Sequence, residues 1–221
     1  MRPPFTPLQF VLLLFVFMLA VIVLYMGIFT LALDKLGLST HSAMLLLAGT
    51  LLGSTINLPL FQITAEAPPQ DEAQSLYLLL FGRPLPFTGK TIVAINVGGA
   101  LIPISFSIYL ASINKLPISQ LLPAIALVTT ICYLASRPIR GIGIGMPIFV
   151  APFVAALTAI LIAPDNSAPL AYICGTLGVL IGADLLHLND IRKIGTPLAS
   201  IGGAGTFDGI FLTGIVAVLL A

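Results

Sequence analysis

The sequence predicts an all-α fold: a polytopic bundle of about seven transmembrane helices, with a small cytoplasmic β-hairpin-like insertion between helices two and three. The first observation is composition. Of the 221 residues, 58% are hydrophobic and only 8% are charged, and the mean hydropathy is +1.13. A soluble domain carries roughly 25% charged residues, so lipid has to be the main solvent. The net charge of +1 gives no reason to expect nucleic acid as a partner.

The second observation is the recurrence of long apolar runs. A transmembrane helix needs roughly 20 predominantly apolar residues. The first run is too long for a signal peptide and lacks a small-residue cleavage site, so it is expected to span the membrane. We place helices at about 8–33, 43–60, 91–113, 119–135, 147–163, 170–188 and 200–221, within a single transmembrane domain covering 1–221.

One long connection, about 61–90, separates helices two and three. It starts with polar and acidic residues and continues with the apolar run 75–81. A run of about seven apolar residues is too short to span a bilayer, and is typical of a strand or an interfacial segment. We therefore expect a small cytoplasmic β-hairpin lying on the membrane.

The third observation is the distribution of basic residues. With seven helices, one side of the membrane holds Arg2, Arg83, Lys90, Arg137, Arg140, Arg192 and Lys193. The other side holds only Lys35 and Lys115. Because cytoplasmic loops are enriched in Lys and Arg, this asymmetry predicts a multi-pass protein of the cell (inner or plasma) membrane, with a cytoplasmic N-terminus and an external C-terminus.

Two acidic residues lie inside predicted helices, where an ionisable group costs roughly 3 kcal/mol or more. Asp184 is near the cytoplasmic end of helix six and Asp208 is near the start of helix seven. Antiparallel neighbouring helices would bring both carboxyls to one depth. There they would share a proton, as general acid–base hydrolysis or a proton relay requires. The alternative is that either residue is hydrated near the interface or lies in the first turn of a helix.

Other polar and small residues surround these aspartates. His187 follows Asp184 at i+3, and the two could ligate a metal together with Asp208. One His with scattered carboxylates favours a hydrogen-bonded His instead, so we expect no metal and no cofactor. Gly205 removes side-chain bulk about one turn before Asp208, where a substrate backbone or water could approach. The glycines at 175, 178 and 182 form a stripe for close helix packing, nearly opposite to Asp184.

A second polar group precedes this region. Asn57 ends the predicted helix two, and Asn96, Gly98 and Gly99, followed by Pro103, should weaken or interrupt helix three. A broken helix at membrane depth lines a cavity in many transporters, so these residues are candidates for substrate binding. The alternative is a proline kink whose backbone groups are satisfied by neighbouring helices.

Three segments carry a resemblance to a known family: Asn96-Val-Gly-Gly-Ala-Leu-Ile-Pro103, Gly182-Ala-Asp-Leu-Leu-His187, and 200–211. They resemble those of an uncharacterised prokaryotic membrane protein family, domain-of-unknown-function family 1614. The resemblance covers most of the chain. It implies a membrane protein and supplies no activity.

The last two helices also resemble the catalytic helices of presenilin-type intramembrane aspartyl proteases. Those enzymes take one aspartate from each of two adjacent helices, the second within a Gly-x-Gly-Asp motif. Here Gly203-Ala-Gly205 is separated from Asp208 by Thr206 and Phe207. No Tyr precedes Asp184, and no Pro-Ala-Leu motif follows helix seven. The resemblance covers about 40 residues.

These observations leave three hypotheses. The first is an intramembrane aspartyl peptidase in which Asp184 and Asp208 cleave a transmembrane peptide. The second is a proton- or cation-coupled transporter or channel with a broken third helix. The third is a scaffold without chemistry of its own. Membrane lipid is a partner in each, and the sequence does not determine the oligomeric state.

Overall fold

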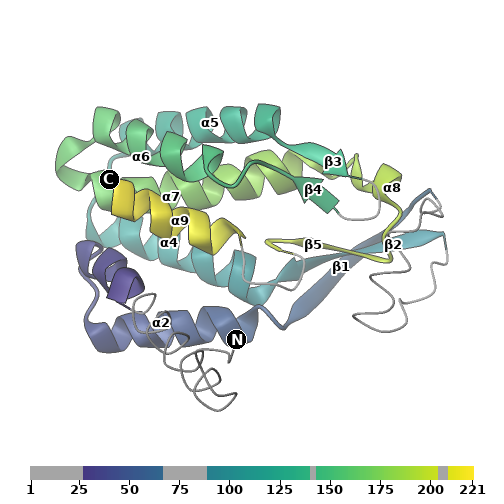
Figure 1. Cartoon of the computed structure of the whole chain (residues 1–221), viewed down its shortest axis with the longest axis horizontal. Helices are drawn as coiled ribbons and strands as arrows, with labels where there is room; N and C mark the ends of the chain where they lie inside the picture. The colour runs from purple at the N-terminus through teal and green to yellow at the C-terminus, as the bar shows by residue number, and fades with distance from the viewer. Residues whose placement is uncertain (1–26, 67–88, 140–142, 204–208) are drawn as a thin grey trace, which may run out of the picture.

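The computed structural model describes residues 27–66, 89–139, 143–203 and 209–221. Helices form one half of the molecule and strands extend from the other half (Figure 1). The α-helices are α2 (Thr40–Gly53), α4 (Ile102–Ile113), α5 (Ile118–Ala135), α6 (Val150–Ile162), α7 (Ser167–Val179), α8 (Ile191–Ile194) and α9 (Gly209–Leu220), with a further helix at Gly27–Lys35. The π-helices are η1 (Val97–Leu101) and η3 (Leu180–Asp184), and the 3₁₀ helices are η2 (Pro164–Asn166) and η4 (Leu185–His187).

Helix α7 is the centre of the helical half. It continues through η3 and η4, so that 164–187 forms one apolar helix. α7 packs against α4, α5, α6 and α9. The predicted glycine stripe explains part of this packing: a Cβ at Gly178 would lie 2.5 Å from Val128 Cγ1, and a Cβ at Gly182 would overlap the Thr129 carbonyl. The absence of side chains at these positions lets α5 approach closely, as small residues do between membrane helices.

Two helices are long and apolar enough to cross a membrane, Ile118–Ala135 and Pro164–His187. A third span results if Gly27–Lys35 and Thr40–Gly53, which meet at 112°, are taken together. α6 is apolar but has only 13 residues, and the described part of α9, also apolar, has 12. At 1.5 Å per residue they are about 18–20 Å long, against a hydrocarbon thickness of about 30 Å. The described residues therefore contain two or three candidate spans rather than the seven full spans expected.

The fold is mostly helical, as predicted, but it is not all-α, because the described residues also form two small sheets. In one, β2 (Lys90–Asn96) lies between β1 (Asn57–Thr64), to which it is antiparallel, and β5 (Leu198–Ile201), to which it is parallel. In the other, β3 (Arg137–Ile139) pairs with β4 (Gly143–Gly145). The predicted helices at 43–60, 91–113 and 200–221 each overlap one strand of the three-stranded sheet, namely β1, β2 and β5. β1 and β2 form a hairpin at the expected insertion, whereas the expected strand at 75–81 lies outside the described residues.

The junction of strands and helices explains the interruption expected in helix three. Lys90–Asn96 is a strand with alternating burial, and the chain then turns directly into η1 and α4. Asn96 is the N-cap, and its side chain accepts a hydrogen bond from the Gly99 amide. Pro103 is the second residue of α4 and directly follows η1, so the π turn lies where proline removes an N–H from the α-helical pattern. The segment is therefore the start of a helix, not a break within one.

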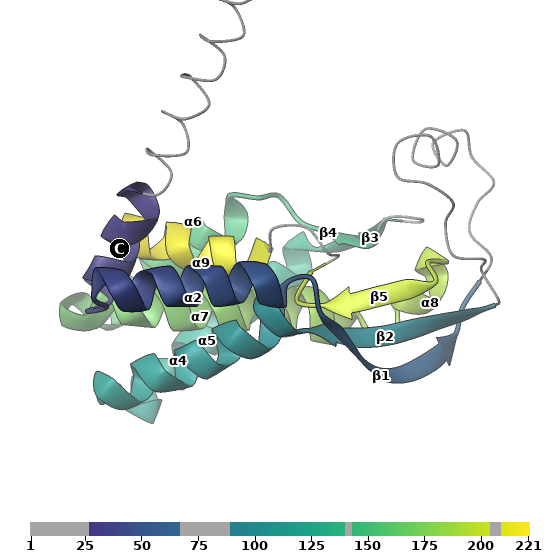
Figure 2. The ribbon, with the colours of Figure 1, turned by 90° about the horizontal axis from the view of Figure 1, so that it is seen from below.

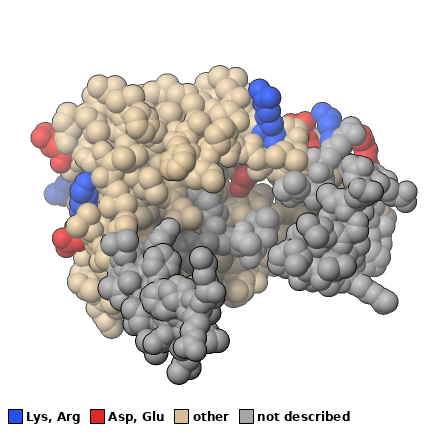
Figure 3. All heavy atoms as spheres, in the orientation of Figure 1, with Lys and Arg blue, Asp and Glu red and all other residues tan. Residues whose placement is uncertain are grey.

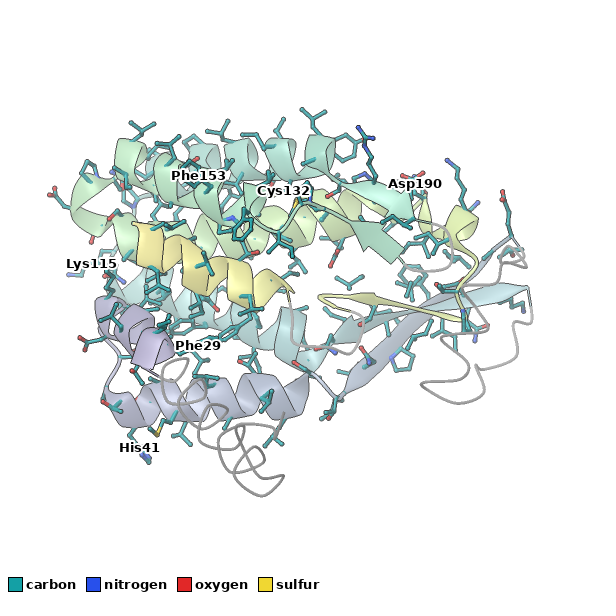
Figure 4. The ribbon with its side chains drawn as sticks, in the orientation of Figure 1. Phe29, His41, Lys115, Cys132, Phe153 and Asp190 are labelled. Carbon is teal, nitrogen blue, oxygen red and sulfur yellow. The ribbon has the colours of Figure 1, made fainter. Side chains whose placement is uncertain are left out.

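Charged side chains gather at the two ends of the molecule (Figure 3). At the strand end, β3 carries Arg137 and α8 carries Arg192 and Lys193 (Figures 1 and 2). Lys115 lies at the opposite end, near the C-terminus (Figure 4). Lys35 is also at that end, because it donates hydrogen bonds to carbonyl groups in the last turn of α9. On the face that Figure 3 shows, the described surface between the two ends is mostly uncharged.

Candidate functional site

Asp184 is the last residue of η3, the point where the long central helix passes from π geometry to the 3₁₀ turn η4. Its carboxylate oxygen Oδ2 accepts a hydrogen bond of 2.7 Å from the Gly202 amide, just after β5. Gly202 has φ of +87° and lies so close to η1 that an added Cβ would be 2.6 Å from the Ala100 Cβ. Only glycine fits this position. The close approach therefore helps to bring the end of β5 to the carboxylate.

Two cavities meet at Asp184. The first, which we call the strand cavity, has a volume of about 280 Å³ and is lined by Asn57, Ile144 of β4, and Leu198 and Ser200 of β5, with Asp184. It lies toward the strand end of the molecule, where the basic residues of α8 and β3 are found. Its polar lining includes a carboxylate, an amide and hydroxyls, so it suits a hydrated or hydrogen-bonding ligand.

The second cavity, which we call the apolar groove, has a volume of about 410 Å³. It runs between the start of α6 and α9, across α7, and its lining includes Phe149, Pro152, Val179, Ile210 and Val216, with Asp184. The side chains at its mouth are exposed, with Phe149 at 77%. An exposed aromatic residue on an uncharged surface is suited to contact with lipid. The groove therefore joins the apolar surface to the carboxylate.

Ile144, Asp184 and Gly203 line both cavities, which makes Asp184 the ionisable group at their junction. In Figure 3, acidic atoms are visible in the middle of the face, between the charged ends. A half-buried carboxylate that can reach both water and an apolar ligand is suited to act as a general base or to bind a proton.

The other predicted catalytic residue, Asp208, lies outside the described residues, as does Gly205. In the sequence, Asp208 directly precedes Gly209, the first residue of α9. The separation of the two carboxyl groups therefore remains a prediction. What the structure adds is that Asp184 is hydrogen-bonded to Gly202, at the beginning of the segment that leads to Asp208.

The predicted binding residues Asn57 and Asn96 form one hydrogen-bond network. Asn96 Nδ2 donates to the Ser54 carbonyl (2.8 Å) and to Asn57 Oδ1 (3.0 Å), while Asn96 Oδ1 accepts from the Gly99 amide (2.7 Å). Asn57 Oδ1 also accepts from the Ser200 hydroxyl. Asn57 lines the strand cavity, whereas Asn96 is 2% exposed and holds β2, α2 and η1 together. The network therefore connects the end of β2 to Ser200 and to the strand cavity.

Gly98 and Gly99 have a structural explanation. A Cβ at Gly98 would overlap the Thr50 carbonyl and the Ser54 amide of α2. Gly99 lies beside Gly202, whose added Cβ would be 2.8 Å from the Gly99 carbonyl carbon. The lack of side chains at these glycines lets α2, η1 and the residue after β5 approach one another closely. This packing explains why glycine occurs at both positions.

His187 is buried, at 6% exposure, and its Nδ1 lies 3.1 Å from the Gly182 carbonyl oxygen. Its ring packs on Tyr133 with centroids 4.8 Å apart. These contacts match the expected hydrogen-bonded His. Among the described residues, no three His, Cys, Asp or Glu side chains lie close enough together to hold a metal ion.

Sequence reasoning missed several residues of the site, among them Ser200 and Thr196 in the strand cavity and Thr213 in the apolar groove. Ser200 was expected to be the first residue of the helix at 200–221. The available signal for a strand was the β-branched Ile201 followed directly by Gly202-Gly203, a combination that marks strand ends.

Comparison with known proteins gives one match. The family model described as "Protein of unknown function (DUF1614)" matches residues 51–220. No curated protein and no solved structure matches the chain, so the resemblance to presenilin-type proteases rests on the sequence motifs alone. The matched region includes both cavities, Asp184 and the whole of the three-stranded sheet. The chain belongs to the DUF1614 family.

Proposed function

We propose that this DUF1614 protein is an intramembrane aspartyl peptidase in which Asp184 and Asp208 hydrolyse a peptide bond of a membrane-embedded substrate. One observation carries the proposal: the Asp184 carboxylate lies where a groove lined by apolar side chains meets a polar cavity. A membrane peptide needs both, because its side chains are apolar and its scissile peptide group must meet water and a proton donor.

The proposed chemistry uses the two carboxyl groups in complementary protonation states. The ionised one accepts a proton from water while the water oxygen bonds to the carbonyl carbon. The protonated one donates its proton to the carbonyl oxygen, which gives a tetrahedral diol. The first carboxyl then protonates the amide nitrogen as the C–N bond breaks. The diol returns a proton to the second carboxylate, leaving a carboxylic acid and an amine.

The proposal includes an orientation. The basic residues of β3 and α8 and the strand cavity lie at the same end of the molecule, and Lys115 and the C-terminus lie at the other. Because basic residues favour the cytoplasm, the strand cavity faces the cytoplasm and supplies water from that side. The C-terminus is then external. The Asp184 carboxylate is reached by water from the cytoplasm and by apolar chains from the bilayer.

The transporter hypothesis lost its principal observation. It depended on an unwound third helix at 96–103, and that segment is a capped strand-to-helix junction with satisfied hydrogen bonds. Transport is therefore an alternative outcome of the experiment below.

The test is cleavage of a single-span model peptide by purified protein in liposomes, followed by mass spectrometry. Asp184→Asn keeps an oxygen that can accept the Gly202 N–H, so it removes the ionisable group without removing the hydrogen bond. We expect Asp184→Asn and Asp208→Asn each to lower the cleavage rate by about a hundredfold or more, the usual contribution of a general acid or base. Asp190→Asn is the matched control, because Asp190 pairs with Lys193 at the strand end.

Each variant is compared with the unmodified protein in thermal unfolding, so that a loss of folding is distinguished from a loss of chemistry. Undiminished cleavage in both aspartate variants would discard the peptidase. Ion flux in the same liposomes that disappears in Asp184→Asn, without any cleavage by the unmodified protein, would replace it with the transporter.

A further inference from the structure

Two strands from different sheets border the strand cavity. β5 is an edge strand of one sheet, since it pairs with β2 on one side. β4 pairs with β3 on one side. Leu198, Ser200 and their neighbours in β5 line the cavity together with Gly143 and Ile144 of β4. Within the described residues, neither strand has a pairing partner on the side that faces the cavity (Figures 1 and 2).

The hydrogen-bond register shows which groups of β5 point to this side. The Ile92 amide donates to the Pro197 carbonyl. In a parallel ladder, alternate residues use both backbone groups toward the same neighbour. Pro197, Ala199 and Ile201 therefore face β2, and the N–H and C=O groups of Leu198 and Ser200 face the cavity side. The Ser200 carbonyl already accepts a hydrogen bond of 3.4 Å from the Gly203 amide, so an added strand would pair with the N–H and C=O of Leu198 and the N–H of Ser200.

We infer that an extended segment of the membrane peptide binds as an additional strand between β4 and β5, immediately after emerging from the apolar groove. The inference rests on the proposed function and specifies the substrate as a polypeptide in extended conformation. The two cavities are continuous because Ile144, Asp184 and Gly203 line both. A chain that follows them passes the Asp184 carboxylate between its apolar part and its extended part.

The chemical groups that line the two cavities indicate which class of ligand they bind. Strand edges present alternating N–H and C=O groups, and a polypeptide backbone satisfies these with regular spacing. A lipid acyl chain would fill the apolar groove but would leave the strand edges without partners. A cation would use the carboxylate but neither the groove nor both strands. A peptide uses all three features, and strand addition also pulls its backbone out of a helix, as hydrolysis of the peptide bond requires.

The first experiment measures binding without cleavage. The probe is a fluorescent synthetic peptide with a Leu/Ala-rich membrane segment of about 20 residues and an alternating Val/Thr tail. It is added to the Asp184→Asn/Asp208→Asn protein in lipid nanodiscs. One N-methyl group is placed at each tail position in turn. A strand between two others uses consecutive N–H groups, alternately to each side. We therefore expect a contiguous stretch of three or four positions, each weakening binding by about tenfold.

The second experiment uses the unmodified site and identifies both walls. The two cysteines of the chain, Cys132 and Cys174, are buried, so an introduced cysteine is the accessible thiol. Ile144→Cys and Leu198→Cys should each form a disulfide with a cysteine in the peptide tail. Leu60→Cys, on the opposite edge strand β1, is the matched control, because Leu60 is 53% and Leu198 41% exposed.

The outcomes separate this inference from the proposed function. Sensitivity at alternate positions only would show pairing with a single strand and overturn insertion between two. Binding that ignores N-methylation, or cross-linking to Leu60→Cys as readily as to Leu198→Cys, would overturn it also. If the unmodified protein still cleaves the peptide in these cases, the proposed peptidase function is retained and only the binding of the substrate as a strand is rejected. The contiguous pattern without any cleavage would overturn hydrolysis and leave a peptide-binding membrane protein.

Discussion

Replacing Asn96 with Ala tests whether the junction of strand and helix is the structural foundation of the site. Asn96 is 2% exposed and joins three segments of the chain. Its side chain makes three hydrogen bonds, two donated to the Ser54 carbonyl and Asn57 Oδ1 and one accepted from the Gly99 amide. Alanine removes all three and leaves the apolar contacts of the Cβ.

The loss of stability depends on the hydrogen-bonding groups that lose their partner when Asn96 is replaced. A net hydrogen bond contributes about 1 kcal/mol, and each buried group left without a partner costs about 1–3 kcal/mol. Asn57 Oδ1 keeps the Ser200 hydroxyl, so the Gly99 amide and the Ser54 carbonyl carry most of the loss. We expect Asn96→Ala to lower the free energy of unfolding by about 3 kcal/mol. For a chain of this length that is a fall of roughly 6–12 °C in the unfolding temperature.

The assay is thermal unfolding in detergent, followed by loss of the monodisperse peak in size exclusion. Asn114→Ala is the matched control. Asn114 makes one local bond, from Nδ2 to the Leu110 carbonyl at the end of α4, and its loss should cost about 1 kcal/mol or less. If Asn96→Ala unfolds within about 2 °C of the unmodified protein, the network does not support the junction, and the structural account of Asn96 is refuted.

Two further predictions concern packing and orientation. Gly178→Ala should lower the free energy of unfolding by about 1–3 kcal/mol through overpacking, because the new Cβ would lie 2.5 Å from Val128 Cγ1; thermal unfolding checks this, and an unchanged stability would contradict the close contact of α5 and α7. In cells, a membrane-impermeant thiol reagent should label Lys115→Cys from outside and leave Arg192→Cys unlabelled until the membrane is opened, since basic loops remain inside. Labelling of both from one side would refute the proposed orientation.

The sequence predicted the central helices well. Helix α5 was expected at 119–135 and occurs at Ile118–Ala135. The helix expected at 170–188 corresponds to α7, η3 and η4. Long apolar runs leave little choice in lipid, because a helix satisfies its own backbone. The glycine stripe likewise predicted a tight contact, since it lies at regular helical spacing.

The strands could not be distinguished in the same way. Lys90–Asn96 and Leu198–Ile201 are short and have no strict alternation of apolar and polar residues in the sequence, so no periodicity separates them from the start of a helix. For locating the site, the positions of single polar residues were more informative than the periodicity of the apolar residues. Asn57 and Asp184 were both singled out because polar groups are expensive in hydrocarbon, and the structure places them on one cavity. Ser200 became part of the site only through the pairing of β5 with β2, a long-range contact that no local signal contains.

The shortness of α6 would have a consequence for a surrounding bilayer. A helix of 13 residues is about 10 Å shorter than the hydrocarbon layer is thick. Lipids beside too short a hydrophobic wall compress, at a modest cost per ångström. The start of α6 lines the apolar groove, so in a bilayer we expect headgroups and their hydration to be drawn inward at its mouth. A peptide segment arriving at the groove would meet a locally thin, wet membrane, in which exposing its backbone costs less than in undisturbed hydrocarbon.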